Sequence, residues 1–423
     1  MRILFILFFS ILFISCSSDN KSERKQINEI LAKGEKITNY EKLSLEDSKE
    51  VSQKNSIKFS KFKKYKNWTH TNYNYTSNIG IRNFNLNYQI DKSKKVLSKN
   101  IFFNNNKIII LNQNGTINIL DENLKIIKKY KFKLKKSKNF VLNFNAAVAD
   151  NSLIISDNLG YIRKINLENG KIVWEKFLSV PFVSNLIIYK NKIYTLNINS
   201  KIFSFSIIDG NQDWSYETAS TLFNTPQAFR IVVSNDILIF SNNAGQLTAI
   251  NLNDYKLLWQ RDLRKFTIFS ANKIFEISNL IIDKQAVFLS SNYGETLAFD
   301  YKTGKNLWSK KFYLNDIILS NKYVFGINTN GYFVIMLKQN GKIIFSKFLK
   351  DKKKRKVIPI KILLNKTNIL ISTNSNKSLL LELNNLGNLD YKKIKFDQYM
   401  HTLNHTFLLN RNRVLRINKK IEF

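Results

Sequence analysis

The chain has 423 residues, with 67 Lys or Arg against 31 Asp or Glu, and its formal net charge is +36. A single cysteine excludes a disulfide framework, and 13 glycines, mostly at predicted hairpin turns, leave little for a phosphate-binding loop. The basic residues are spread over nearly every predicted turn, with dense runs only at 128–138 and 350–356, and no nucleic-acid-binding motif accompanies them. We therefore predict no nucleic-acid partner, and we interpret the charge as a coding bias towards Lys, Asn and Ile together with attraction to anionic lipid head groups.

The first sixteen residues have the features of an exported lipoprotein. Arg2 precedes an apolar stretch, residues 3–14, which is too short to span a bilayer and is typical of a secretory signal. It ends before Ser15 and Cys16, and this junction resembles the bacterial lipobox. We predict a signal peptide over residues 1–15 and a lipid attached to Cys16. An ordinary signal with a chance cysteine, or a membrane-anchoring helix, is the alternative.

Residues 16–56 follow as a polar stretch that is rich in Lys, Glu, Ser and Asn and poor in aromatic residues. This composition predicts a flexible tether, with one or two helical turns around residues 23–31. Counted from Cys16, the second position is Ser17, so the common signal for retention in the inner membrane is absent and the outer membrane is favoured. Residues 57–423 remain as one large domain.

One short sequence motif recurs along this domain: a strand led by a small residue, a polar turn, and a strand that ends in an aromatic residue. Four copies, spaced by 40, 45 and 49 residues, end in a tryptophan: Trp174, Trp214, Trp259 and Trp308. Three weaker copies have Lys128, Phe345 and Tyr391 in its place. Each unit also contains a β-branched run, so we interpret it as a four-stranded meander. Seven such units at this period predict a β-propeller.

The two ends of the domain read as halves of an eighth unit. Residues 406–417 supply two strands and then stop before any tryptophan strand, whereas Trp68 is unmatched near the start. We therefore predict an all-β, eight-bladed propeller, with seven blades as the fallback, in which residues 63–71 pair with the last strands and close the ring. We predict that five tryptophans are structural residues of the blades, packing between neighbours and donating an N–H to a turn carbonyl: Trp68, Trp174, Trp214, Trp259 and Trp308.

No motif in the sequence predicts catalysis. His401 and His405 have a spacing that binds metals on helices, but they flank a strand-like stretch with no third ligand nearby. Residues 300–308 match the repeat of pyrroloquinoline quinone dehydrogenases, yet the adjacent cysteines and the calcium ligands of those enzymes have no counterpart here. We expect a protein that is not an enzyme and that has neither a metal nor a cofactor.

The lipobox, the tether and the eight-fold set of Trp-ended repeats together resemble the BamB family of outer-membrane β-barrel assembly lipoproteins, over residues 68–423. The resemblance implies a scaffold that is lipid-anchored on the periplasmic face of the outer membrane. It would dock on the periplasmic domains of BamA, meet other members of the assembly complex, and assist the folding and insertion of unfolded outer-membrane protein clients.

In that family BamA is bound by two neighbouring inter-blade loops, one with leucines and an arginine and the next with a short acidic segment. The matching loops here are residues 217–230, after Trp214, and residues 263–278, after Trp259; the second keeps only one acidic residue. The candidate partner-binding residues are Leu222, Phe223, Arg230, Phe269, Phe275 and Glu276. The alternative for the apolar four is that they cover the blade ends as minor core, and their burial distinguishes the two.

Two other functions stay open. A propeller lipoprotein that binds polysaccharide or peptidoglycan would need an aromatic, carboxylate-rich funnel, and a quinoprotein-like enzyme would need bound quinone or calcium. The sequence contains no ordered motif for either.

Overall fold

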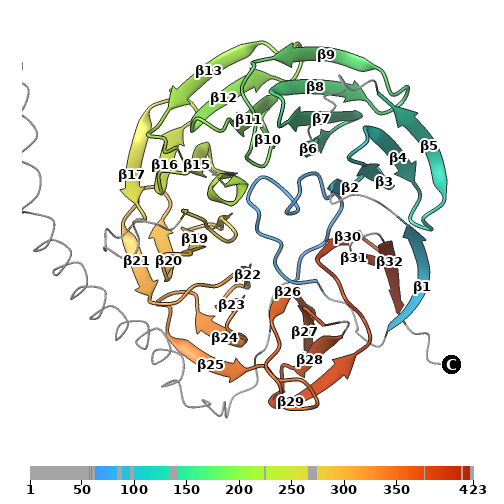
Figure 1. The fold of residues 1–423 in the computed structure, drawn as a ribbon, viewed down its shortest axis with the longest axis vertical. Helices are drawn as coiled ribbons and strands as arrows, with labels where there is room; N and C mark the ends of the chain where they lie inside the picture. The colour runs from blue at the N-terminus through green and yellow to red at the C-terminus, as the bar shows by residue number, and fades with distance from the viewer. Residues whose placement is uncertain are drawn as a thin grey trace, which may run out of the picture. The chain divides into compact units, whose positions relative to one another are not determined.

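The computed structural model describes residues 57, 59, 62–82, 88–95, 100–132, 142–222, 225–264, 274–375, 377–410 and 413–419. These residues form eight four-stranded antiparallel sheets arranged in a ring, which is an eight-bladed β-propeller (Figure 1). The predicted fold and blade number are thus confirmed. The predicted signal peptide, Cys16 and the whole of the predicted tether lie outside the described residues. Within them, no helix has the length and apolar character needed to cross a membrane.

Seven blades are each built from four consecutive strands, with the first strand innermost. The strands of blades 1 to 4 are β2 (Asn100–Asn104), β3 (Lys107–Leu111), β4 (Thr116–Leu120) and β5 (Ile126–Lys131); β6 (Phe144–Ala149), β7 (Ser152–Asp157), β8 (Tyr161–Asn166) and β9 (Ile172–Phe177); β10 (Ile187–Tyr189), β11 (Lys192–Leu196), β12 (Lys201–Ser206) and β13 (Gln212–Glu217); β14 (Arg230–Ser234), β15 (Ile237–Ser241), β16 (Gln246–Asn251) and β17 (Leu257–Asp262). Those of blades 5 to 7 are β18 (Ile281–Ile282), β19 (Ala286–Ser291), β20 (Glu295–Asp300) and β21 (Asn306–Lys310); β22 (Asp316–Leu319), β23 (Tyr323–Ile327), β24 (Tyr332–Leu337) and β25 (Ile343–Phe348); β26 (Pro359–Leu364), β27 (Asn368–Thr373), β28 (Ser378–Glu382) and β29 (Asn385–Lys392).

Burial follows the position of a strand in its blade. The second strands are continuous apolar runs and are almost wholly buried, as β7 illustrates, because both of their faces contact neighbouring blades. The fourth strands are exposed over much of their length, as β9 illustrates. The apolar clusters lie between blades; one joins blades 1 and 2, and another joins blades 2 and 3. The core is therefore distributed around the ring, and each blade depends on its neighbours.

The eighth blade combines both ends of the chain. Its three inner strands are β30 (Gln398–His401), β31 (Thr406–Asn410) and β32 (Arg413–Lys419), and its outermost strand is β1 (Tyr88–Lys95), which pairs antiparallel with β32. The ring is thus closed by strands from the two ends. The prediction that residues 63–71 make this pairing is wrong, because Trp68 is buried inside the ring, whereas an outermost strand has one exposed face.

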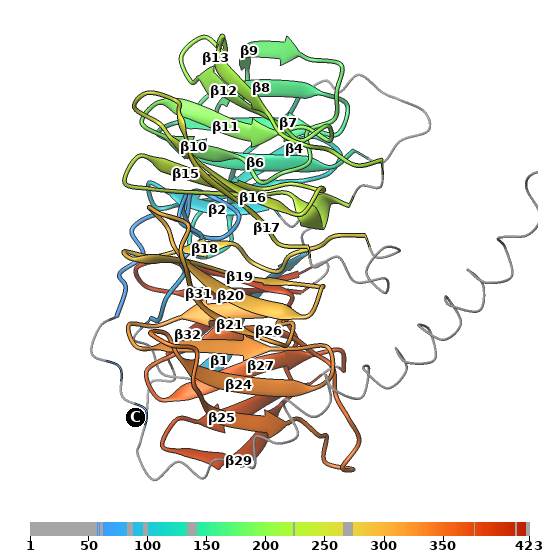
Figure 2. The same ribbon diagram turned by 90° about the vertical axis from the view of Figure 1, so that its left-hand side faces the viewer.

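Residues 62–82, which we call the channel segment, run through the centre of the ring (Figures 1 and 2). The segment is joined by one link after another to the innermost strands of blades 1 to 5. These links are two hydrogen bonds between the Trp68 and Phe103 backbones, and bonds from the N–H groups of Val148, Ile188, Val233 and Ile282 to Thr69 O, His70 Nε2, Tyr75 O and Thr76 O. The channel is therefore blocked by the chain itself.

Aromatic and charged side chains fix the channel segment to blade 8. The rings of Tyr65 and Trp68 lie 4.8 and 5.9 Å from the ring of His401. The guanidinium of Arg82 donates to Leu403 O at 2.7 Å and to Thr406 Oγ1 at 3.0 Å. Trp68 thus belongs to the channel and not to the outer strand of a blade, which corrects the expectation that it is a blade tryptophan.

The other four tryptophans pack against the following blade. Their ring N–H groups, except that of Trp214, donate to turn carbonyls there: Trp174 to Ile207 O at 3.2 Å, Trp259 to Tyr301 O at 3.0 Å and Trp308 to Lys338 O at 2.9 Å. Trp214 instead stacks on Tyr255, with ring centroids 4.8 Å apart. The indole ring of Trp259 also lies on Gly304, where a Cβ would be 2.6 Å from Cδ2. The glycine of the repeat therefore makes room for the tryptophan of the preceding blade.

Replacing Gly304 by Ala should destabilise the protein by about 1–3 kcal/mol, because the new Cβ would meet the Trp259 ring and because φ at this position is +66°. The midpoint of urea unfolding measures the change. Gly387→Ala is the matched control, since no atom lies within 3.3 Å of the added Cβ there. Equal midpoints for the two variants would contradict the packing role of Gly304.

His70 makes the folded ring sensitive to acid. Its Nε2 accepts the Ile188 N–H at 3.0 Å, so this imidazole is neutral in the folded protein, and burial lowers its pKa from 6.5 to about 3. Burial also lowers the pKa of His401. The unfolded chain therefore binds more protons than the folded chain below pH 6.5, and the stability that each neutral ring contributes is lost as the pH falls from about 6.5 towards the folded pKa.

The unfolding free energy should be about 2 kcal/mol lower at pH 5 than at pH 7.5 because of His70 alone. Denaturant unfolding at the two pH values tests this in the wild type and in His70→Gln, whose amide oxygen can accept the Ile188 N–H without a proton that titrates. The variant should keep only the part of the pH dependence that His401 contributes. An unchanged pH dependence in the variant would show that His70 does not carry the effect.

Candidate functional site

We call the side of the ring on which the innermost strands begin the loop face, because the loops between blades cross it, and the opposite side the turn face. Near the start of its innermost strand each blade places one polar side chain at the mouth of the channel. In blade order these are Asn100, Asn145, Asn185, Arg230, Asn279, Asp316, Lys361 and Gln398. We call this set the polar ring.

A cavity of about 360 Å³ opens at this mouth. Every member of the polar ring except Asp316 lines it, together with Trp68, Thr71, Asn72 and Ile79 of the channel segment. The channel segment therefore forms its floor and separates it from the turn face.

Several members of the polar ring hold one blade to the next. Asn185 accepts the Ile231 N–H and donates to Ile231 O, both at 2.9 Å. Asp316 accepts the Ile362 N–H at 2.9 Å and pairs with Lys361 Nζ at 2.7 Å. Sequence reasoning missed this set because an asparagine before an apolar run looks like an ordinary turn residue; its recurrence at the blade period is the signal that could have revealed it.

Replacing Lys361 by Met should destabilise the ring by about 2–3 kcal/mol, because it leaves the buried Asp316 carboxylate without its cation. Lys366→Met, at an exposed position on the turn face, is the control and should change stability by about 0.5 kcal/mol or less. Thermal or urea unfolding of both variants gives the comparison. A Lys361 variant as stable as the control would mean that the ion pair contributes nothing.

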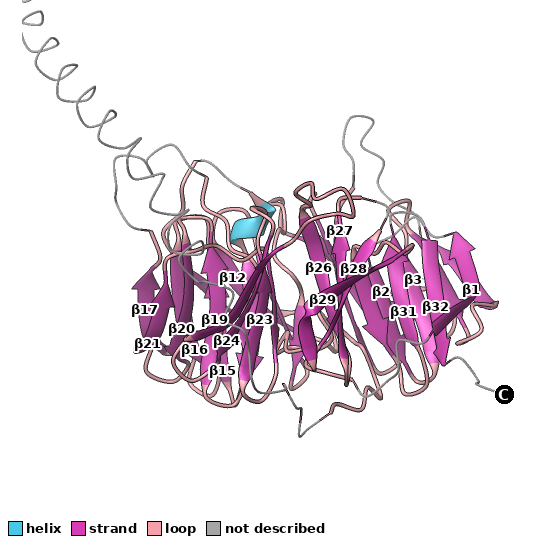
Figure 3. Ribbon diagram, turned by 90° about the horizontal axis from the view of Figure 1, so that it is seen from below, coloured by secondary structure: helices cyan, strands magenta, loops and turns pink. Residues whose placement is uncertain are grey.

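The two candidate docking loops lie side by side on the loop face. Residues 217–230 connect β13 to β14 and contain the 3₁₀ helix η2 (Pro226–Ala228), which Figure 3 shows on the rim of the ring. Residues 263–278 lead from β17 towards β18. The Ile277 N–H donates to Gln227 O at 3.4 Å, and Thr225 Oγ1 donates to Glu276 Oε1 at 3.4 Å. The described parts of the loops are therefore joined to each other.

The six candidate residues have different environments. Leu222 is 96% exposed, whereas Phe275 is buried against Tyr293 and is not available to a partner. Arg230 and Glu276 are half-buried. Phe223 and Phe269 lie outside the described residues. Sequence reasoning missed Ile274, which is 45% exposed in the second loop.

Arg230 and Glu276 are coupled across the loops. The Arg230 Nη1 donates to Pro226 O at 2.9 Å and to Phe229 O at 2.8 Å. Burial lowers the pKa of Arg230, while the nearby Tyr313 and Glu276 favour its charged form. Burial raises the pKa of Tyr313, and the charge of Glu276 raises it further. The only basic group of the first loop thus also lines the cavity and interacts with the only acidic group of the second.

The two histidines with metal-like spacing flank the turn between β30 and β31. His401 is buried with its Nδ1 3.0 Å from Thr406 Oγ1, and His405 Nε2 lies 3.5 Å from Glu122. Across the described ranges, no three His, Cys, Asp or Glu side chains converge as metal ligands.

A closed ring of eight blades in which tryptophans dock on the glycines of the next blade defines a propeller of the class built from Trp-ended repeats. The chain belongs to the family of the outer membrane protein assembly factor BamB, whose family model matches residues 128–347. The family resemblance noted in the sequence is thereby confirmed.

The relatives of that name are distant in sequence. The outer membrane protein assembly factor BamB of Moranella endobia is 20% identical over 237 residues, which cover 49% of this chain and 58% of the relative. That of Yersinia pestis is 20% identical over 220 residues, 49% of this chain and 55% of the relative. The chain thus matches little more than half the length of these curated relatives. The crystal structure of BamB from Moraxella catarrhalis shares the fold, with a TM-score of 0.65, 13% identity, and coverage of 78% of this chain and all of that one.

Proposed function

We propose that this protein is a non-enzymatic scaffold of an outer-membrane β-barrel assembly complex, and that it binds the periplasmic domains of BamA through the two joined loops on the loop face. The observation that carries the proposal is the pairing of these loops in a member of the BamB family. The same role includes contacts with other members of the complex and assistance to unfolded outer-membrane protein clients. A lipid on Cys16 would hold the scaffold at the periplasmic face of the outer membrane.

The geometry of the loops supports a protein contact. Leu222 and Ile274 present apolar side chains to solvent from adjacent loops, and such exposed groups are typical of partner surfaces. Thr225, Glu276 and Arg230 tie the loop bases to each other and to η2, so binding a partner costs little additional ordering there. The contact would therefore have an apolar centre with Arg230 and Glu276 at its edge.

The cavity gives no support to a polysaccharide-binding function. Its two aromatic lining residues, Trp68 and Tyr399, are buried, so neither presents a ring face on which a sugar could stack. Some of its polar lining residues, such as Asn185 and Lys361, already form hydrogen bonds or ion pairs between blades.

A pull-down with the periplasmic domains of BamA from the same organism tests the proposal. The double variant Leu222→Glu, Ile274→Glu should lower the affinity at least tenfold, because it places two carboxylates in the apolar centre of the contact. Ile208→Glu is the matched control, since Ile208 is 73% exposed in a hairpin turn on the turn face.

Loss of binding in the double variant alone would support both the scaffold and its site. Equal binding by wild type, control and double variant would place the contact elsewhere on the ring. Absence of binding by the wild type would overturn the proposed function.

A further inference from the structure

The loop between β25 and β26 concentrates positive charge on the loop face. Six of the seven residues 350–356 are Lys or Arg, and all six are exposed. Exposed lysines of blade 7, Lys377 and Lys393, lie in the same two-blade sector. We call these eight residues the basic patch: Lys350, Lys352, Lys353, Lys354, Arg355, Lys356, Lys377 and Lys393.

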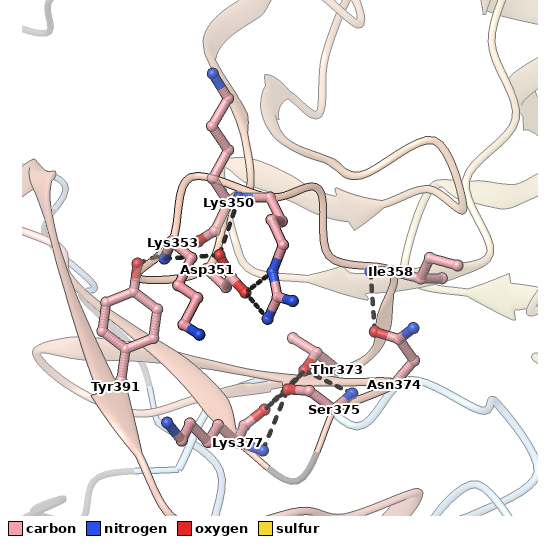
Figure 4. Close-up of polar contacts among 10 residues, drawn as sticks. Lys350, Asp351, Lys353, Ile358, Thr373, Asn374, Ser375, Lys377 and Tyr391 are labelled. Carbon is pink, nitrogen blue, oxygen red and sulfur yellow. Dashed lines mark hydrogen bonds and ion pairs between the residues drawn. The ribbon is translucent and has the colours of Figure 1, made fainter.

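The single acidic residue of the loop organises its backbone (Figure 4). Asp351 Oδ1 accepts the N–H groups of Lys353 and Arg355, at 2.8 and 2.9 Å. Asp351 Oδ2 accepts from Arg355 Nε at 2.9 Å and lies 2.7 Å from Arg355 Nη2. An isolated antiparallel bridge between Lys350 and Lys356 closes the loop. The loop therefore presents its lysines from a defined turn.

Aromatic rings and the neighbouring hairpin support this arrangement. Lys352 Nζ lies 5.3 Å from the centroid of the Tyr391 ring, and the Tyr391 hydroxyl donates to Lys350 O at 3.1 Å. The Ile358 N–H donates to Asn374 Oδ1 at 3.2 Å, which fixes the end of the loop to the hairpin that carries Lys377. Ile358 itself is an exposed apolar side chain beside the lysines.

The density of positive charge in the basic patch is higher than the overall composition of the chain would give. On the turn face, Lys256 has an acidic neighbour in its own hairpin turn, Asp254, 3.7 Å away. In residues 350–356 six basic residues outnumber one carboxylate, Asp351, which is bound by the turn of its own loop. Asp390 is the acidic neighbour from β29, and it pairs with Lys392 at 2.8 Å.

We propose that the basic patch docks on the anionic headgroups of a phospholipid bilayer. A strongly basic surface with an exposed apolar side chain beside it suits a sheet of phosphates. A lipid at Cys16 would keep the ring near such a surface, because only about 40 residues separate Cys16 from Ile57. The patch lies in blades 6 and 7, away from the docking loops of blades 3 to 5, and of the proposed function the inference uses only the lipid at Cys16.

Co-sedimentation with vesicles tests this inference on the mature chain, residues 16–423, with Cys16→Ser so that no acyl chain contributes. The vesicles are phosphatidylglycerol with phosphatidylethanolamine, and phosphatidylcholine alone serves as the neutral comparison. The patch variant carries Gln at Lys352, Lys353, Lys354 and Lys356. The charge-matched control carries Gln at four exposed lysines of the turn face: Lys302, Lys305, Lys322 and Lys342.

The wild type and the control should bind the anionic vesicles and not the neutral ones, with an affinity that falls as salt is added. The patch variant should bind roughly 600-fold more weakly, since each of the four replaced lysines contributes about fivefold near an anionic surface. Circular dichroism confirms that both variants are folded.

Equal losses in the patch variant and the control would show that only net charge matters and would overturn the inference, as would binding that ignores lipid charge. If the patch variant binds vesicles like the wild type but loses the BamA domains in the pull-down, the patch is a protein-docking surface instead.

Discussion

Closure of the ring is the constraint on which the rest of the structure depends. The apolar clusters lie between blades, so every blade needs a neighbour on each side, and the last blade is completed by the pairing of β1 with β32. Tryptophan–glycine docking repeats along the chain, but it cannot supply the eighth interface by itself. One antiparallel ladder between distant segments therefore decides whether the other seven interfaces form a closed core.

The channel segment and the polar ring also hold neighbouring blades together. The segment binds the innermost strands of five consecutive blades, and the polar ring joins neighbouring blades at the mouth through Asn185 and the Asp316–Lys361 pair. The loop face gains a rigid rim from this arrangement. The loops that we propose as the docking site start from that rim, because Arg230 is at once a member of the polar ring and the residue where β14 begins.

The repeated elements could be predicted from the sequence, and the unique ones could not. Recurring aromatic-ended strands and β-branched runs predicted seven meanders, because spacing and period are local properties, and the two chain ends suggested the eighth. Trp68 looked like one more copy of the repeat, yet its place in the channel depends on contacts with Tyr65 and His401 that no local pattern encodes. For the candidate site, the sequence located both loops. It could not separate Leu222, which is exposed, from Phe275, which is core, because burial is a tertiary property.

The order of elements along the chain also has a mechanical meaning. The channel segment comes directly before β1, so the anchorage inside the ring and the strand that closes the ring are in series. Tension applied from the N-terminal side is borne first by the links at Trp68, Thr69, His70, Tyr75 and Thr76. Only after these give way does load reach the β1–β32 ladder. The contacts of the channel segment thus protect the closing strand pair from force applied at the N-terminal side.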